Sequence, residues 1–128
     1  MPSPGPEVEV LVIEDDDLVM SVVERTLRHA GYAVHQAYNG EDALETLESH
    51  VGTLRAVYLD LTLPRMTGDE VLARIRARAP SLPVLLSSGH EPRQIRSATL
   101  SSAAGFLQKP FRSGELLDAL HRAIGATA

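Results

Sequence analysis

Five short apolar segments alternate with five amphipathic segments along the 128 residues, and this alternation constrains the fold more than any other feature. The apolar segments are typical of strands because they are short and rich in Val, Ile and Leu. They cover residues 8–13, 33–37, 56–60, 83–87 and 105–108. The amphipathic segments repeat apolar residues at helical spacing and cover about 18–30, 41–50, 68–79, 92–100 and 113–124. Strict alternation predicts a parallel sheet with helices on both faces.

Five such units match the flavodoxin-like (βα)5 arrangement, a doubly wound sheet of strand order 2-1-3-4-5, although alternation alone also permits other orders. The length suits one domain, and a hydrophobic fraction of 44% is enough for a core. We expect this domain to cover residues 8–128. Residues 1–7 contain several Pro and a Gly, which predicts a flexible lead-in or the remnant of a linker.

The composition argues against several classes of function. Cysteine is absent, so disulfides and thiolate metal sites are excluded, which fits a cytoplasmic protein in a reducing compartment. The net charge of -5 and the few aromatic residues argue against direct nucleic-acid binding, which needs a basic face or stacking surfaces. No apolar run approaches the roughly 20 residues of a transmembrane helix, so we expect no membrane contact.

The third strand segment ends on a carboxylate, Asp60, and a polar loop with Pro64 and Gly68 follows it. In parallel α/β sheets, ligands bind in the crevice outside the carboxyl ends of the strands. Asp60 therefore stands where such a fold carries out its chemistry. Asp is also a common turn residue, so capping of the next turn explains Asp60 equally well on its own.

Polar side chains at three other strand ends favour a chemical role. Acids follow the first strand, a hydroxyl the fourth and an ammonium group the fifth, namely Glu14, Asp15, Asp16, Ser88 and Lys109. Clustered carboxylates repel one another, and oxygen ligands without His or Cys favour Mg²⁺ as the neutralising cation. A cation, a lysine and a hydroxyl around one free carboxylate describe a site for phosphoryl transfer to an aspartate.

Four segments together resemble the receiver domain of two-component response regulators. VLVIEDD covers the first strand, LDLTLPRMTG the third, PVLLSSG the fourth and GFLQKPF the fifth. Each segment alone is a weak signal, but all four occur in order, and the resemblance runs from about Val8 to Ile124. It implies the strand order 2-1-3-4-5 and a bound Mg²⁺, neither of which the composition shows.

The resemblance implies a role for the acids of the crevice. Asp60 matches the phosphoacceptor, and Asp15 matches the carboxylate that binds Mg²⁺ directly. Glu14 matches the neighbouring acid, which usually acts through water. Thr62 stands where the family offers a backbone carbonyl to the metal, and where the residue often sets the lifetime of the phosphoryl group.

The resemblance also implies a phosphoryl-binding pair and a switch. Ser88 matches the residue whose hydroxyl bonds a phosphoryl oxygen, and Lys109 matches the phosphate-binding lysine, which precedes Pro110 in a bond that is often cis. Phe106 matches the aromatic switch residue, with plain core packing as the alternative. Phosphorylation would draw Ser88 inward and Phe106 after it, which changes the face of helix four, strand five and helix five. The same face is the predicted surface of a homodimer.

Other residues are expected to serve the fold. Asp16 and Asp17 should cap the first helix, and Ser113 the last. The fourth helix segment, 92–100, should be weak because it is rich in Ser and Thr and short of apolar residues. The five His show no paired spacing, so we expect them on the surface or at helix ends.

Three functions remain open from the sequence. A receiver would accept a phosphoryl group from a histidine kinase or histidine phosphotransfer protein, and would catalyse only its own phosphorylation and dephosphorylation. A phosphatase with an aspartyl-phosphate intermediate is the second, but haloacid-dehalogenase-type enzymes place a second acid two residues after the nucleophile, where this chain has Thr62. A phosphorylation-independent interaction module is the third, and it is disfavoured because the acids and Lys109 are all present.

The wider context of the receiver also stays open. A stand-alone response regulator and a receiver within a longer chain both fit the sequence. PVLLSSGH followed by GFLQKPF resembles the C-terminal receivers of hybrid histidine kinases, so we favour a receiver of that kind.

Overall fold

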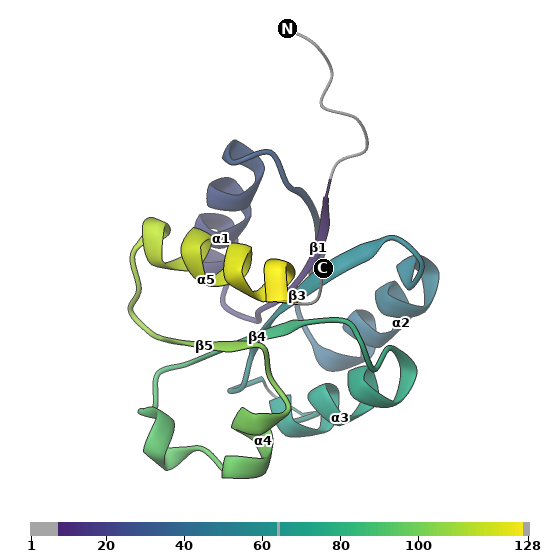
Figure 1. The fold of residues 1–128 in the computed structure, drawn as a ribbon, viewed down its shortest axis with the longest axis vertical. Coiled ribbons are helices and arrows are strands. Elements are labelled where there is room, and N and C mark those ends of the chain that lie inside the picture. Colours follow the sequence, from purple (N-terminus) through teal and green to yellow (C-terminus); the bar gives the residue numbers. More distant parts are fainter. Residues whose placement is uncertain (1–7, 64, 127–128) are drawn as a thin grey trace, which may run out of the picture.

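The fold was analysed in a computed structural model that describes residues 8–63 and 65–126 (Figure 1). Five parallel strands form one sheet in the order β2-β1-β3-β4-β5, which confirms the order that the resemblance implied. The strands are β1 (Glu9–Ile13), β2 (Ala33–Ala37), β3 (Leu54–Asp60), β4 (Val84–Ser88) and β5 (Gly105–Gln108). The lead-in predicted for residues 1–7 lies outside the described residues.

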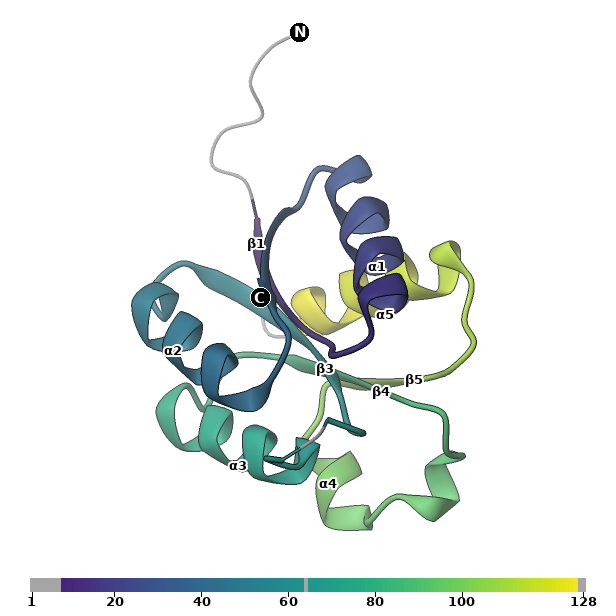
Figure 2. The ribbon, with the colours of Figure 1, turned by 180° about the vertical axis from the view of Figure 1, so that it is seen from behind.

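Helices cover both faces of the sheet. They are α1 (Asp17–His29), α2 (Gly40–His50), α3 (Gly68–Arg78), α4 (Ser97–Ser101) and α5 (Ser113–Ala126), with a short 3₁₀ helix η1 (Pro92–Gln94) before α4. Both views show α1 and α5 together on one face and α2, α3 and α4 on the other (Figures 1 and 2). None of these helices in the described part of the chain is long and apolar enough to cross a bilayer.

Two hydrophobic clusters fill the space between the sheet and its helices. Successive strand residues point to opposite faces, so Val10 and Val12 of β1 pack with α1 and α5, whereas Leu11 and Ile13 pack with α2 and α3. The central strands are therefore buried on both sides, which explains their nearly continuous aliphatic sequence.

The start of α1 follows the prediction for Asp16, whereas Asp17 is the first residue of the helix rather than its cap, and the predicted cap of α5 is also wrong. Asp16 caps α1 by accepting hydrogen bonds from the backbone N–H groups of Leu18 and Val19. Ser113 is instead the first residue of α5, so its predicted capping role is wrong. The side chain of Glu115 reaches back and accepts from the N–H of Arg112 at 2.8 Å. A first-turn glutamate thus satisfies the N–H of the residue that precedes the helix, as in one half of a capping box.

The segment 92–100 does not form one helix. Ile95 has an extended conformation between η1 and α4, with φ -103° and ψ 141°. Side-chain competition weakens the helix, because the hydroxyls of Ser101 and Ser102 both donate to the backbone carbonyl of Ala98. The expected weakness is thus real, and it splits the segment into two short pieces.

A tight loop carries the chain from β3 to α3 beside the end of the sheet. A Cβ atom at Gly68 would lie only 2.5 Å from the Cα of Leu61, so only glycine fits there. Thr67 caps α3 by accepting from the N–H of Glu70 at 3.2 Å. This loop fixes the residues that follow Asp60.

Candidate phosphoacceptor site

Polar residues from four strands converge at the carboxyl edge of the sheet. Asp60 is the last residue of β3, and Ser88 is the last residue of β4. Glu14 directly follows β1, and its N–H donates to the carbonyl of Ala37 in β2. Lys109 directly follows β5, and its N–H donates to the carbonyl of Ser88 at 2.8 Å. The parallel ladder therefore places these residues side by side, as the sequence predicted.

The ammonium group of Lys109 sits between two buried carboxylates. Its Nζ lies 2.8 Å from Oε1 of Glu14 and 3.4 Å from Oδ2 of Asp60. Glu14 is 0% exposed and Asp60 is 1% exposed, whereas the Lys109 side chain keeps 22% of its surface exposed. The peptide bond from Lys109 to Pro110 is cis, as the resemblance suggested.

Asp15 completes a group of three acids that could hold a metal ion. One carboxylate oxygen from each of Glu14, Asp15 and Asp60 lies within 4.8 Å of the others. Asp15 is exposed, so the group opens to solvent on its side. Oxygen donors from carboxylates suit a hard cation such as Mg²⁺, which binds one or two carboxylates and keeps several waters.

The buried groups perturb one another's protonation. Burial, together with the neighbouring Asp60, raises the pKa of Glu14 to about 7. Burial also acts to raise the pKa of Asp60, but hydrogen bonds from Glu14 and Thr62 and the charge of Lys109 outweigh it and lower this pKa. Burial acts to lower the pKa of Lys109, but both carboxylates overcome it and raise this pKa. Asp60 and Lys109 thus stay charged, and Glu14 is the group that exchanges a proton near neutral pH.

Thr62 holds one oxygen of Asp60. Its backbone N–H and its hydroxyl both donate to Oδ1, at 3.0 and 2.8 Å. The resemblance identified Thr62 as a backbone carbonyl ligand and as a position that often sets the lifetime of the phosphoryl group, and both roles stay predictions. The hydroxyl contact leaves Oδ2, which faces Lys109, as the less constrained oxygen of Asp60.

A buried chain of hydroxyl groups lies beneath the acids, and the sequence analysis missed it. The hydroxyl of Ser87 donates to the Tyr58 oxygen at 2.8 Å, and the Tyr58 hydroxyl donates to Oε1 of Glu14 at 3.4 Å. Burial raises the pKa of Tyr58, which therefore remains a donor. The available signal was the spacing: Tyr58 stands two residues before Asp60, on the same face of β3.

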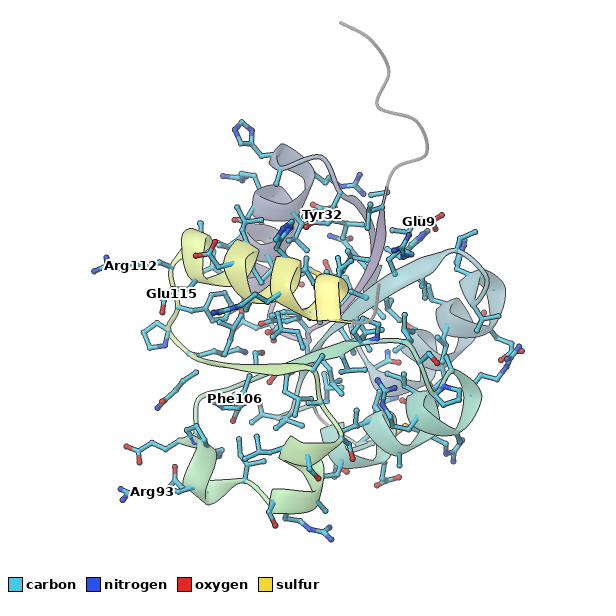
Figure 3. The ribbon with its side chains drawn as sticks, in the orientation of Figure 1. Glu9, Tyr32, Arg93, Phe106, Arg112 and Glu115 are labelled. Atoms are coloured by element: carbon cyan, nitrogen blue, oxygen red, sulfur yellow. The ribbon has the colours of Figure 1, made fainter. Side chains whose placement is uncertain are left out.

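The two predicted switch residues lie on neighbouring strands. Ser88 is buried, and its oxygen accepts the N–H of His90 at 3.0 Å. Phe106 is half-buried and packs against the hydrophobic cluster on the α2 and α3 face, as do Leu100 and Ala103 near the end of α4. Figure 3 shows Phe106 on the side of β5 that faces α4. Both residues lie on the strands next to the site, and their role as a switch stays a prediction.

The raised pKa of Glu14 predicts a pH-dependent stability. A group whose pKa is higher in the folded chain stabilises the fold at low pH and loses that contribution as the pH rises through the folded value. We therefore expect the free energy of unfolding, measured with urea in EDTA, to fall between pH 5 and pH 8. The shift from 4.5 to about 7 sets an upper limit of roughly 3 kcal/mol.

Two matched variants test whether Glu14 causes this decrease in the free energy of unfolding. Glu14→Gln should remove most of this decrease, whereas Glu45→Gln, at an exposed position of α2, should keep it. An unchanged decrease in Glu14→Gln would show that another group is responsible.

Curated proteins with similar sequences are signalling proteins. The chain is 35% identical over 108 residues to the sensor kinase CckA of Brucella abortus, which covers 84% of this chain and 11% of that protein. It is 36% identical over 111 residues to the response regulator MprA of Mycolicibacterium vanbaalenii, which covers 86% of this chain and 47% of that protein. The chain thus spans less than half the length of these relatives.

Solved structures share the fold along almost the whole chain. A CheY-like receiver domain protein from Methanospirillum hungatei superposes with a TM-score of 0.87 at 20% identity, over 95% of this chain and 97% of that one. The chemotaxis protein CheY4 of Vibrio cholerae gives 0.84 at 28% identity, over 92% and 99%. The family model of the response regulator receiver domain matches residues 10–121. With this match and the strand-end acids in place, the chain belongs to the receiver domains of two-component response regulators.

Proposed function

We propose that Asp60 accepts a phosphoryl group from a phosphohistidine of a histidine kinase or histidine phosphotransfer protein. The position of the Lys109 ammonium group between the buried carboxylates of Glu14 and Asp60 carries this proposal. Receiver domains interact with such partners, and the sensor kinase CckA is among the relatives. We also propose that the chain acts in the cytoplasm, where its phosphoryl donors have their catalytic parts.

The acids fit Mg²⁺ as the cofactor of this reaction. Three carboxylates share one cationic neighbour, so the cluster carries excess negative charge, and a proton on Glu14 removes only part of it. Asp15 and Asp60 would bind the ion directly, Glu14 through water, and Thr62 through its carbonyl. Bound Mg²⁺ neutralises the acids and the phosphoryl oxygens, which lets the two anions approach each other.

The chain's own residues prepare the nucleophile. The lowered pKa keeps Asp60 ionised, and Thr62 fixes the carboxylate through Oδ1. Oδ2 is then the attacking oxygen: it forms the bond to phosphorus while the bond from phosphorus to the donor's imidazole nitrogen breaks, and that nitrogen keeps the electron pair. The Lys109 ammonium group, beside Oδ2, binds a phosphoryl oxygen as a point charge.

The new phosphoryl group changes the balance of contacts around Ser88. The Ser88 oxygen now accepts a hydrogen bond from the N–H of His90. A phosphoryl oxygen is a charged and therefore strong acceptor, to which the Ser88 hydroxyl would donate. Movement of Ser88 gives Phe106 room to turn inward, and α4, only five residues long, can shift with it. The change is a population shift between two packings of the α4–β5–α5 face, which is also our proposed homodimer surface.

We propose that the chain does not turn over external phosphate esters. Thr62, rather than an acid, stands two residues after Asp60, and its hydroxyl donates to the nucleophile. A general acid for a leaving group is therefore missing from that position. The chemistry would be limited to phosphorylation and dephosphorylation of Asp60 itself.

Phosphorylation by a small donor tests the proposal. Incubation with acetyl phosphate and Mg²⁺ should add one phosphoryl group to the intact mass, and EDTA should prevent the addition. Asp60→Asn should abolish it, whereas Asp118→Asn, at an exposed position of α5, should retain it. An adduct that persists in Asp60→Asn, or steady-state hydrolysis of p-nitrophenyl phosphate by the wild type, would overturn the proposal.

An apolar groove beside Lys109 suggests how the donor docks. Leu18 is 75% exposed and Val22 is 51% exposed, both on α1. They line a groove of about 470 Å³ together with Phe111 and Lys109, so the groove adjoins the site directly. We propose that it receives the helix that carries the phosphohistidine, because burying these side chains places the donor next to Asp60.

A charge placed in the groove should separate docking from chemistry. Leu18→Glu should slow transfer from a phosphorylated histidine phosphotransfer protein that labels the wild type by at least about tenfold, since a buried unpaired charge is costly. Labelling by acetyl phosphate should not change. Ala77→Glu, which adds the same charge at an exposed position of α3, should leave the rates of labelling by both donors unchanged. Equal slowing with both donors would place Leu18 in the fold or the site rather than in docking.

A further inference from the structure

Two histidines and a glutamate form a second cluster, away from the acids around Asp60. Nε2 of His35 lies 2.8 Å from Oε1 of Glu9, and Nδ1 of His50 lies 3.9 Å from the same oxygen. The two imidazole rings stack with centroids 4.1 Å apart and an angle of 29° between their planes. His50 lies at a helix end, as expected, whereas His35 lies within β2, and no spacing in the sequence predicts their contact.

The fold brings these residues together from three elements. Glu9 begins β1, and Figure 3 shows it beside the start of that strand. His35 lies in the middle of β2, paired with Leu11, which shares its face of the sheet with Glu9. His50 is the last residue of α2, the helix that covers this face. Spacing along the sequence cannot reveal the cluster because it depends on strand register and on the end of a helix.

The donor atoms of the three residues lie about as close together as the ligands of one metal ion. One donor atom from each residue lies within 4.8 Å of the others. Bonds of about 2.0 Å to a tetrahedral ion would separate its ligands by about 3.3 Å, and the two distances to the Glu9 oxygen, 2.8 and 3.9 Å, bracket that value. The donor atoms are therefore close enough for one ion, but the two stacked imidazole rings must rotate out of their stack to point their nitrogen lone pairs at it.

The electrostatic setting also suits a cation. The hydrogen bond from His35 outweighs the opposing effect of burial and lowers the pKa of Glu9, so this ligand is ionised. Thr53 donates to the same Glu9 oxygen at 3.1 Å and orients the carboxylate. His50 stands at the carboxyl end of α2, where the helix dipole favours positive charge. The three ligand side chains are 25 to 38% exposed, so an ion can reach them from solvent.

We infer that Glu9, His35 and His50 bind one divalent transition-metal ion of the Zn²⁺ class. Two imidazoles and one carboxylate suit Zn²⁺ and leave a fourth position for water, whereas Mg²⁺ prefers oxygen ligands alone. Binding exchanges the hydrogen bond between Glu9 and His35 for metal bonds, and each imidazole offers an unprotonated nitrogen. The ion would tie β1, the edge strand β2 and the end of α2 together.

Metal titration of the untagged full chain tests the inference. With Mg²⁺ present throughout, Zn²⁺ should bind by calorimetry with one high-affinity site per chain, and Co²⁺ should give the visible absorption of a tetrahedral complex. His35→Gln and His50→Gln should each weaken Zn²⁺ binding by at least about tenfold, because each removes a direct ligand. His29→Gln, at an exposed histidine of α1, should bind as the wild type does.

Two further variants keep the test independent of folding and of the acidic site. Glu9→Gln keeps an oxygen acceptor for His35 but removes the charged ligand, so it should weaken binding without loss of the circular dichroism of the fold. Asp60→Asn should leave the affinity for Zn²⁺ unchanged. Absence of binding in the wild type, full binding in both His35→Gln and His50→Gln, or loss of binding in Asp60→Asn would overturn the inference.

Discussion

The functional edge of this receiver depends on one ammonium group among buried carboxylates. Glu14 and Asp60 are almost fully removed from water, and a carboxylate in that position is very costly unless it is paired. Lys109 supplies the pairing, but a single positive charge does not balance Glu14, Asp15 and Asp60 together. Without a second cation, a proton on Glu14, whose pKa is about 7, removes one of the excess negative charges and leaves another. The remaining charge is what the proposed Mg²⁺ would neutralise.

The same charge balance connects the site to the rest of the domain. In the proposed function, phosphorylation would add negative charge beside Lys109 and offer new acceptors to Ser88, which now contacts the N–H of His90. The helix proposed to respond, α4, is short and is weakened by its own hydroxyl side chains. A well-packed sheet edge therefore lies next to a poorly stabilised helix. Low local stability of this kind would allow phosphorylation of Asp60 to change the α4–β5–α5 face. Tyr58 and Ser87 brace Glu14 from below and do not share that freedom.

The sequence predicted the features that follow from hydrophobic periodicity and from the order of the segments. It missed the features that depend on contacts between residues distant in the chain. Strand ends could be located from the apolar runs, so Asp60, Ser88 and Lys109 were placed correctly, whereas the order of the strands came from the family resemblance. Tyr58 and Ser87 were missed because each lies within an apolar run and reads as core. The pairing of His35 with His50 was missed because it depends on the position of α2 over the sheet. The position of the break at Ile95 was missed because helix propensities predict a weak helix but not where it is interrupted.

In the proposed function, the phosphoryl group resides on Asp60. Reduction of the phosphorylated chain with borohydride converts an aspartyl phosphate to homoserine, and peptide mass mapping then identifies the modified position. We expect this modification in the peptide that contains residues 56–63, at position 60 alone, and only in samples phosphorylated with Mg²⁺ present. A modification at Asp15, or a phosphorylated chain with no reducible acyl phosphate, would contradict the claim.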